Sequence, residues 1–258
     1  MSERVKIILD KNADILRLPA IALRGLVVFP GNIIHFEVGR KKSIAAIEWA
    51  MSNNNAVFLT AQQDMDVEDP GFKDLYAYGV VAEVKQVLRV SDELVKVLVE
   101  GKYRAKLLTL DSSGRFLLAS TKAAALRGTK SVDSARVEAL VRSVKEAFEE
   151  YLSLNPRLSK DVVYTIITNE DAALLCDYIP ANLLLKYTDK QALLNEGTVS
   201  GRLEKLLEIL RRETKILHIE KDIQSKVNEQ MDKNQRDYYL REQMRAISNE
   251  LDDFDDTR

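Results

Sequence analysis

Residues 17–125 alternate between short apolar runs and turn residues. The runs are rich in β-branched and aromatic side chains, and Pro30-Gly31 and the Asp-Ser-Ser-Gly segment at 111–114 stand between them as turn signals. This pattern is typical of strands joined by tight turns. It predicts six or seven strands in a small barrel or sandwich, at residues 21–29, 33–38, 56–61, 79–90, 94–100, 103–110 and 116–121.

Two features interrupt these runs. Ser43 is a good N-cap, and Ile44, Ile47 and Met51 recur at helical spacing until three asparagines at 53–55, so we expect one helix there. Gly101-Lys102 separates two of the runs and predicts a bend or bulge between them.

Residues 131–196 follow a helical period instead. Apolar residues between Val137 and Leu152 recur on one face, opposite charged residues, as in an amphipathic helix. Three shorter helices are expected after it, the second ending near Pro180, with N-caps at Ser159, Asn169 and Thr188. The segment predicts a small helical bundle.

The last segment has no proline, and no glycine after Gly201. At 1.5 Å per residue, a continuous helix of ~50 residues would reach ~75 Å. Its leucine stripe at 203–210 is expected to pack on the bundle, whereas the apolar stripe between 222 and 237 is too thin for deep burial. Residues 240–254 then follow the 4-3-4-3 spacing of a coiled-coil seam. This helix is expected to be a connector or an oligomerisation arm.

The arm carries its own candidate contact residues. Two adjacent tyrosines cannot both face one seam, so one should be exposed unless a second surface covers it. Tyrosine and methionine are typical of protein interfaces, although packing within the same chain is the alternative. The candidates are Met231, Tyr238, Tyr239, Leu240, Met244, Ile247 and Leu251.

Composition narrows the class of protein. With 258 residues, 46% of them apolar, the chain has room for one or two domains and a sizeable core. It has neither a membrane-length apolar stretch nor a signal-peptide core, so no membrane association is expected. One cysteine, Cys176, excludes an internal disulfide and predicts a buried, inert thiol and a cytoplasmic location. The net charge of −2 leaves nucleic acid only as a minor alternative partner.

No motif for a reactive site is present in the sequence. Gly101-Lys102 is followed by Tyr103, where a phosphate-binding loop needs Ser or Thr. His35 and His218 are too far apart to suggest a metal site. We therefore expect no catalytic residue, cofactor or metal in this chain, and a role in holding or recognition.

Five segments resemble the N-terminal domain of Lon proteases. They are LPAIALRGLVVFPG at 18–31, VGRKKSI at 38–44, YGVVAEV at 78–84, VLVEG at 97–101 and EQMDKNQRDYYLREQ at 229–243. The last segment is similar to the stretch that leads into the family's ATPase module. The segments occur in the family's order over nearly the whole chain, and Ala22 stands where the family usually has a second proline.

The resemblance implies an α+β fold in three parts. These are a β-rich, PUA-like pseudo-barrel lobe with one helix (1–125), a helical lobe (126–200) and a long connecting helix (201–258). It also implies a subunit of a hexameric ATP-dependent serine protease. The Walker motifs, the Ser-Lys dyad, and the sites for ATP and Mg²⁺ are expected only in modules that follow. This chain is expected to recognise substrates and gate access to the protease, with a pure scaffold as the alternative.

The resemblance also implies unfolded or damaged proteins as partners, besides other subunits. Such substrates display apolar side chains, and their receptor needs exposed apolar area or a free sheet edge. Val95, Val97 and Val99 alternate with Leu94, Lys96 and Leu98, so Leu98 is expected on the outer face. The alternative for each candidate is core packing. The candidates are Phe29, Pro30, Ile33, His35, Leu88, Val90 and Leu98.

A basic triplet, Arg40-Lys41-Lys42, precedes the expected start of the first helix. Cations at a helix N-terminus oppose the helix dipole. An anion bound by the triplet and the free N–H groups is one interpretation, and a solvated charged corner is the other.

Overall fold

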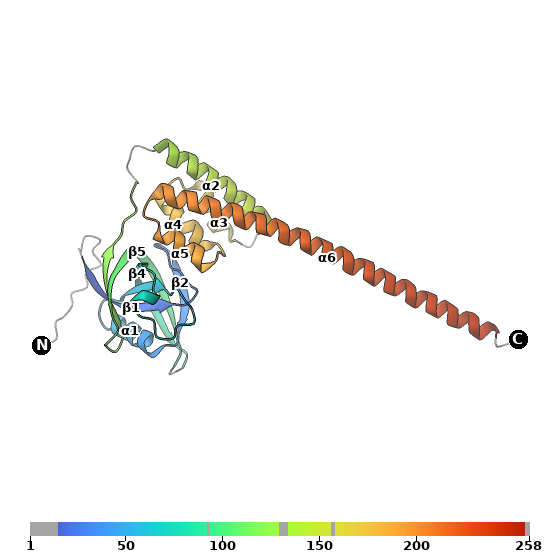
Figure 1. The fold of residues 1–258 in the computed structure, drawn as a ribbon, viewed down its shortest axis with the longest axis horizontal. Helices are drawn as coiled ribbons and strands as arrows, with labels where there is room; N and C mark the ends of the chain where they lie inside the picture. Colours follow the sequence, from blue (N-terminus) through green and yellow to red (C-terminus); the bar gives the residue numbers. More distant parts are fainter. Residues whose placement is uncertain (1–14, 92, 129–133, 156–157, 256–258) are drawn as a thin grey trace.

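The computed structural model describes residues 15–91, 93–128, 134–155 and 158–255, with side chains up to residue 247. Figure 1 shows three parts in chain order: a β-lobe, a helical lobe beside it, and one long helix that projects far beyond both. The mixed α+β fold expected from the sequence is confirmed.

The β-lobe is a six-stranded sheet that closes on itself. Its order is β2-β5-β4-β3-β1-β6, and β5 also pairs with β6. Only β1 and β3 run parallel among these pairs. The barrel prediction is confirmed, with one long strand where two were expected at 94–110. The strands are β1 (Leu16–Leu23), β2 (Ile33–Val38), β3 (Ala56–Ala61), β4 (Tyr78–Arg89), β5 (Val95–Asp111) and β6 (Leu117–Ala123).

The bulge expected at Gly101-Lys102 is confirmed. Val81 pairs with Tyr103 and Ala82 with Gly101, so Lys102 is an extra residue in β5. A Cβ at position 101 would lie 2.2 Å from the carbonyl oxygen of Phe29, which is why only glycine fits. The backbone of Gly101 also donates to Asn32 O at 2.9 Å and accepts from Gly31 N at 2.8 Å. The bulge therefore fixes the turn that leads into β2.

Helix α1 (Lys41–Met51) begins two residues before the predicted cap. Ser43 is buried in its first turn, and Arg40 stands at the N-cap without a side-chain cap bond. The prediction for Ser43 was wrong because the start of the helix is set by long-range contacts of Arg40, whose guanidinium donates to Ala22 O and Val67 O.

The helical lobe follows β6. Ser159 caps α3 as predicted, whereas Asp171 caps α4 and Lys186 precedes α5 in place of Asn169 and Thr188. Helix α4 also continues past Pro180. The helices are α2 (Ser134–Leu154), α3 (Lys160–Thr168), α4 (Ala172–Asn182), α5 (Tyr187–Asn195) and α6 (Val199–Asp255); the short 3-10 turn η1 (Phe72–Asp74) lies in the β-lobe.

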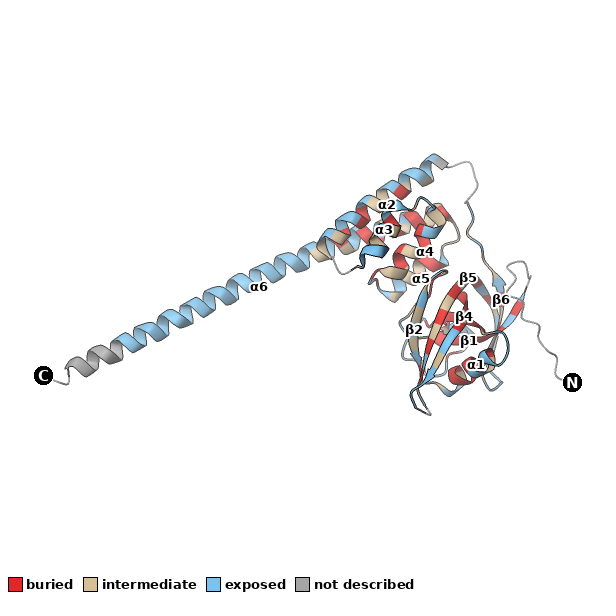
Figure 2. Cartoon of the chain, turned by 180° about the vertical axis from the view of Figure 1, so that it is seen from behind, coloured by how far each residue is buried: buried red, intermediate tan, exposed pale blue. Residues whose placement is uncertain are grey.

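The long helix α6 is continuous, as its lack of glycine and proline predicted. Leu203, Leu206 and Leu210 are fully buried, so the leucine stripe packs on the bundle as expected. Burial ends at Leu217, and every residue from 218 to 247 is exposed (Figure 2). Its 57 residues extend about 86 Å.

The two lobes share one continuous core and a polar junction. The larger of the two buried clusters contains residues of β1 to β5 and of α1 to α6. At the junction, Arg104 of β5 stacks 4.1 Å from the centre of the Tyr78 ring and donates to Asn195 O at 2.8 Å. Gln191 donates to Tyr78 O at 2.8 Å. These contacts tie α5 to β4 and β5.

A buried ion pair stabilises the start of α6. Arg202 is 1% exposed, and its guanidinium pairs with the carboxylate of Asp177 on α4. It also donates to Glu196 O at 3.1 Å and Leu194 O at 3.4 Å. The charge of Arg202 therefore depends on one carboxylate for its neutralisation.

Candidate functional site

The outer face of β2, β5 and β4 brings together five of the predicted contact residues. The register places Leu98 between His35 on β2 and Gln86 on β4. Leu88 lies opposite Lys96, diagonal to Leu98 and within reach of a long side chain. Ile33 shares the face of His35, two residues away on β2. We call Ile33, His35, Leu88, Val90 and Leu98 the outer-face patch.

Three apolar residues of this patch are largely open to solvent. Ile33 is 61% exposed, Leu88 59% and Val90 52%. His35 is exposed, and Leu98 is half-buried beside exposed Lys96 while Val97 and Val99 are buried. The expected outward position of Leu98 is therefore confirmed.

Two predicted contact residues lie elsewhere. Phe29 is fully buried in the core, so the expectation that it contributes to an exposed surface is wrong. The cause is the docking of the 29–32 turn against Gly101, which directs the ring inward. Pro30 is half-buried at the same turn.

A closed square of ion pairs borders the patch. Lys85 Nζ lies 2.9 Å from Glu83 and 2.8 Å from Glu100, and Lys102 Nζ lies 2.8 Å from Glu83 and 2.7 Å from Glu100. Hydrogen bonds from Lys102 and Lys85 lower the pKa of Glu100 to about 2, and they lower the pKa of Glu83 as well. Lys102 is the bulge residue, so the bulge supplies one corner of the square.

The square predicts a dependence of stability on pH. The pKa of Glu100 in the folded state lies below its ordinary value of 4.5, so its ionised form stabilises the fold above pH 4.5. This contribution is lost as the pH falls toward 2. We expect Glu100→Gln to lower the urea midpoint at pH 7, and the difference from wild type to shrink between pH 4.5 and 2.

Urea unfolding followed by circular dichroism at several pH values measures this effect. Glu37→Gln is the matched control, because Glu37 makes one exposed ion pair with Lys96 at 3.2 Å and should contribute little. A Glu100→Gln difference that stays constant down to pH 2 would contradict the assigned role of the square.

The patch adjoins an open sheet edge. Strand β2 ends the sheet order and pairs only with β5. An edge strand presents N–H and C=O groups that can pair with another extended chain. One exposed apolar side chain of the patch, Ile33, therefore lies on the strand that has the open edge.

Helix α6 carries the second predicted set. Met231, Tyr238, Tyr239, Leu240, Met244 and Ile247 are all exposed. Both tyrosines are open, where at least one was expected to be. The side chain of Leu251 lies outside the described residues.

The sequence prediction missed apolar exposure on the helical lobe. Leu184 is 78% exposed in the α4–α5 connection, and Tyr164, Ile167 and Leu174 are also exposed. Their helical periodicity resembles that of core residues, so no local signal separates them. It also missed a cavity between β1 and β2 near Arg24, where the only local sign was the Arg24-Gly25 interruption of an apolar run.

Reactive groups are scarce among the described residues. Cys176 is buried, and burial raises the pKa of its thiol to about 12, so the thiol is protonated and inert as expected. In the described part of the chain, no cluster of His, Cys, Asp or Glu could hold a metal ion. None of the helices described is long and apolar enough to cross a membrane.

A barrel with an open edge and exposed apolar residues, fused to a helical lobe and a long stalk, defines a two-lobed binding module. Comparison with known proteins gives its family. The profile described as "ATP-dependent protease La (LON) substrate-binding domain" matches residues 17–212. The chain belongs to this Lon substrate-binding family.

Relatives and solved structures agree with this assignment. Lon protease of Escherichia coli (strain K12) is 39% identical over 246 residues, 95% of this chain and 31% of the relative. Lon protease of Heliobacterium modesticaldum is 38% identical over 256 residues, 99% of this chain and 31% of the relative. The chain thus spans about a third of the length of these relatives.

The fold is shared with a solved structure. The N-terminal domain of Mycobacterium avium complex Lon protease matches with a TM-score of 0.61 at 20% identity, covering 76% of this chain and 98% of that one. At this identity the match supports the fold alone.

Proposed function

We propose that this chain recognises exposed apolar segments of unfolded or damaged proteins through the outer-face patch. The observation that carries the proposal is the exposure of Ile33, Leu88 and Val90 on one face of the sheet, with Ile33 on β2, whose edge is free. Folded proteins bury such side chains, whereas unfolded chains offer both apolar residues and unpaired backbone groups. The patch can bind the first, and the edge strand can pair with the second.

Binding to one protein in its native and heat-denatured forms tests the proposal. We expect the chain to bind the denatured form and the Ile33→Asp/Leu88→Asp variant to bind it about tenfold or more weakly, because a buried apolar side chain contributes about 1.5–3 kcal/mol. Both positions are exposed, so the fold should tolerate the change. Fluorescence anisotropy of the labelled denatured protein is the measurement.

The control is Leu184→Asp, which alters an exposed leucine outside the patch. Equal binding of the native and denatured forms, or equal loss in the control, would exclude the patch as the recognition surface.

Helix α6 is proposed to join copies of this chain. Its exposed apolar residues from Ile216 to Ile247 have no cover within the described chain. Pairing two such stripes would bury them. This observation also supports the alternative that the chain is a scaffold without substrate affinity of its own.

Sedimentation distinguishes self-association through α6 from substrate binding through the outer-face patch. We expect the wild-type chain to associate with rising concentration, and Tyr238→Glu/Met244→Glu to stay monomeric while it retains binding to denatured protein. Gln235→Glu, a polar exposed position on the same helix, should associate like the wild type. Association without any binding to denatured protein would favour the scaffold.

The activity of the whole protein is part of the same proposal. The relatives are named Lon proteases, and this chain covers about a third of them. We infer that ATP-dependent peptide cleavage belongs to a cytoplasmic hexamer in which this chain recognises substrates and gates their access. The α6 stalk would position the two lobes relative to the ATPase and protease parts.

A further inference from the structure

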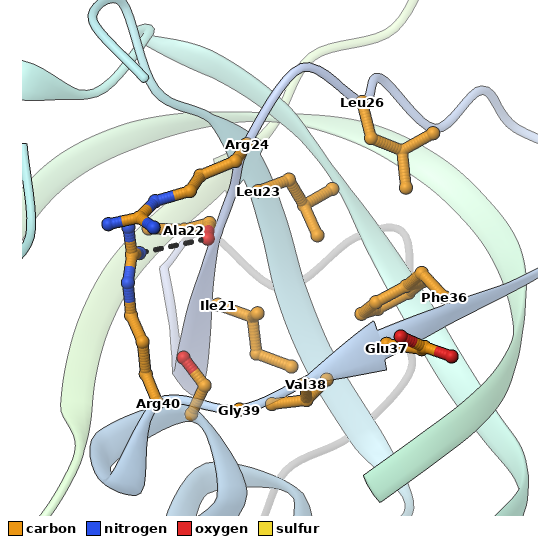
Figure 3. Close-up of a pocket in the computed structure, with 11 residues that line it drawn as sticks. Ile21, Ala22, Leu23, Arg24, Leu26, Phe36, Glu37, Val38, Gly39 and Arg40 are labelled. Carbon is orange, nitrogen blue, oxygen red and sulfur yellow. Dashed lines mark hydrogen bonds between the residues drawn. The ribbon is translucent and has the colours of Figure 1, made fainter. Parts of the chain in front are cut away.

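A cavity opens between the end of β1 and the end of β2, away from the outer-face patch. Its volume is about 330 Å³. Its apolar walls come from both strands and from the segment after β1 (Figure 3). They are Ile21, Leu23, Leu26, Phe36 and Val38.

The cavity exists because the barrel lacks a strand at this point. Residues 16–20 of β1 pair with β6, but residues 21–23 pair only with β3. Strand β2 pairs only with β5. Two strand edges therefore lie on either side of the cavity without a strand between them, and an extended segment could use either edge.

Two arginines stand at the mouth of the cavity. Arg24 follows β1, where Gly25 turns the chain with φ +62°, and Arg40 follows β2. Figure 3 shows their guanidinium groups close together, with Arg40 Nη1 donating to Ala22 O at 3.3 Å.

The donors at this mouth outnumber their acceptors. Arg24 Nη2, Arg40 Nη2 and Gln62 Nε2 all donate to the one carbonyl oxygen of Val67, at 3.3, 3.2 and 2.9 Å. A carbonyl oxygen has two lone pairs, whereas each guanidinium has five N–H groups. Arg40 also donates to Ala22 O and to Gln62 Oε1. Both guanidinium groups still retain N–H donors beyond these contacts.

The positive charge at the mouth is not neutralised by an ion pair. Burial and then the charge of Arg24 lower the pKa of Arg40, with Asp69 and Glu68 opposing. Within the described chain, no carboxylate lies within 4.0 Å of either guanidinium, and Asp69 pairs instead with Lys42 at 2.9 Å. An anionic group would fit beside an apolar cavity here.

We propose that this cavity binds the C-terminal residue of a polypeptide, with an apolar side chain against Ile21, Phe36 and Val38 and its carboxylate at Arg24 and Arg40. A terminal residue carries both groups on one Cα. A cavity of this size is at the lower end for small ligands and holds one or two residues. The strand edges favour a peptide over a free acid, because they can pair with its backbone.

This inference rests on the proposed function, since the ligand is again a polypeptide and the same free edge of β2 is used, but it adds a cavity and two arginines that the outer-face patch does not include. Labelled polar octapeptides ending in leucine, as the free acid or as the amide, are the probes, together with a free acid ending in serine. Fluorescence anisotropy should show the leucine acid binding about fivefold or more tightly than either alternative, as expected for a charge-assisted contact.

Arg24→Gln should remove the preference for the acid over the amide. Arg24 is exposed and makes one long hydrogen bond, so the fold should persist. Arg17→Gln, which changes an exposed arginine on β1 away from the cavity lining, should retain the preference. Equal affinity for acid and amide, or an unchanged preference in Arg24→Gln, would overturn the proposal.

The cavity proposal and the patch proposal can be contradicted independently of each other. The Ile33→Asp/Leu88→Asp variant should lose denatured-protein binding and keep the acid preference of the octapeptide. If the wild type binds denatured protein but shows no acid preference, the cavity proposal alone fails. If it shows the preference but does not bind denatured protein, the patch proposal alone fails.

Discussion

Asp177→Ala is expected to lower the free energy of unfolding by about 3–5 kcal/mol, because it leaves a buried guanidinium without a counter-charge. Arg202 is 1% exposed, and its remaining contacts are backbone carbonyls. Its pairing with Asp177 fastens α6 to α4, so the loss should also loosen the helical lobe. Urea unfolding followed by circular dichroism measures the change.

A double variant tests whether the loss in Asp177→Ala comes from the unpaired charge of Arg202 rather than from the lost packing contact. Asp177→Leu/Arg202→Met replaces the pair by apolar groups and should recover most of the loss, since buried pairs are often replaceable in this way. Glu138→Ala breaks the exposed pair with Arg142 and should cost about 0.5 kcal/mol or less. A loss below about 1 kcal/mol for Asp177→Ala would contradict the buried-charge argument.

Gly101→Ala is expected to destabilise the chain by about 1–3 kcal/mol through overpacking. The new Cβ would lie 2.2 Å from Phe29 O and 3.3 Å from a methyl group of Val28, so backbone must shift. The hydrogen bonds that hold Gly31 and Asn32 would shift with it. Binding of denatured protein should therefore weaken as the start of β2 moves.

Gly114→Ala, in the turn between β5 and β6, is the matched control. Its Cβ would meet Phe116 O at 3.7 Å, an ordinary contact, so little change in stability is expected. Thermal unfolding of the two variants gives the comparison. Equal stability of the two would show that the 101 backbone can relax without cost.

Local pattern predicted the regular elements well. The runs at 33–38 and 56–61 coincide with β2 and β3, because β-branched residues between turn residues leave few alternatives. The helix from 199 follows from the absence of glycine and proline. Gly101-Lys102 was identified as irregular because glycine beside a charged residue interrupts an apolar run.

The errors arose where distant segments decide the outcome. Phe29 stands before a Pro-Gly turn, and its burial depends on Gly101, far along the chain. The start of α1 depends on Arg40 contacting Ala22 and Val67 rather than on Ser43. Periodicity shows which residues share a face of a strand. It does not show which of the two faces becomes buried when the barrel closes.

The cavity could not be predicted for the same reason. Its walls come from β1, β2 and the segment between them, and its charge comes from Arg24 and Arg40 meeting above it. The sequence showed only that Arg24-Gly25 interrupts an apolar run and that a basic triplet precedes a helix. Of that triplet, Arg40 faces the cavity mouth, whereas Lys42 pairs with Asp69.

Because burial along α6 ends at Leu217, one end of this helix is held by the helical lobe and the other end projects into solvent. Residues 199–217 are clamped by the helical lobe over about 28 Å, and residues 218–247 extend freely for about 45 Å. Since the lobes share one core, a tilt at the clamp moves both together. A tilt of 10° would displace the far end of the exposed segment sideways by about 8 Å, so a small rotation of the lobes becomes a large transverse movement at the end of the helix.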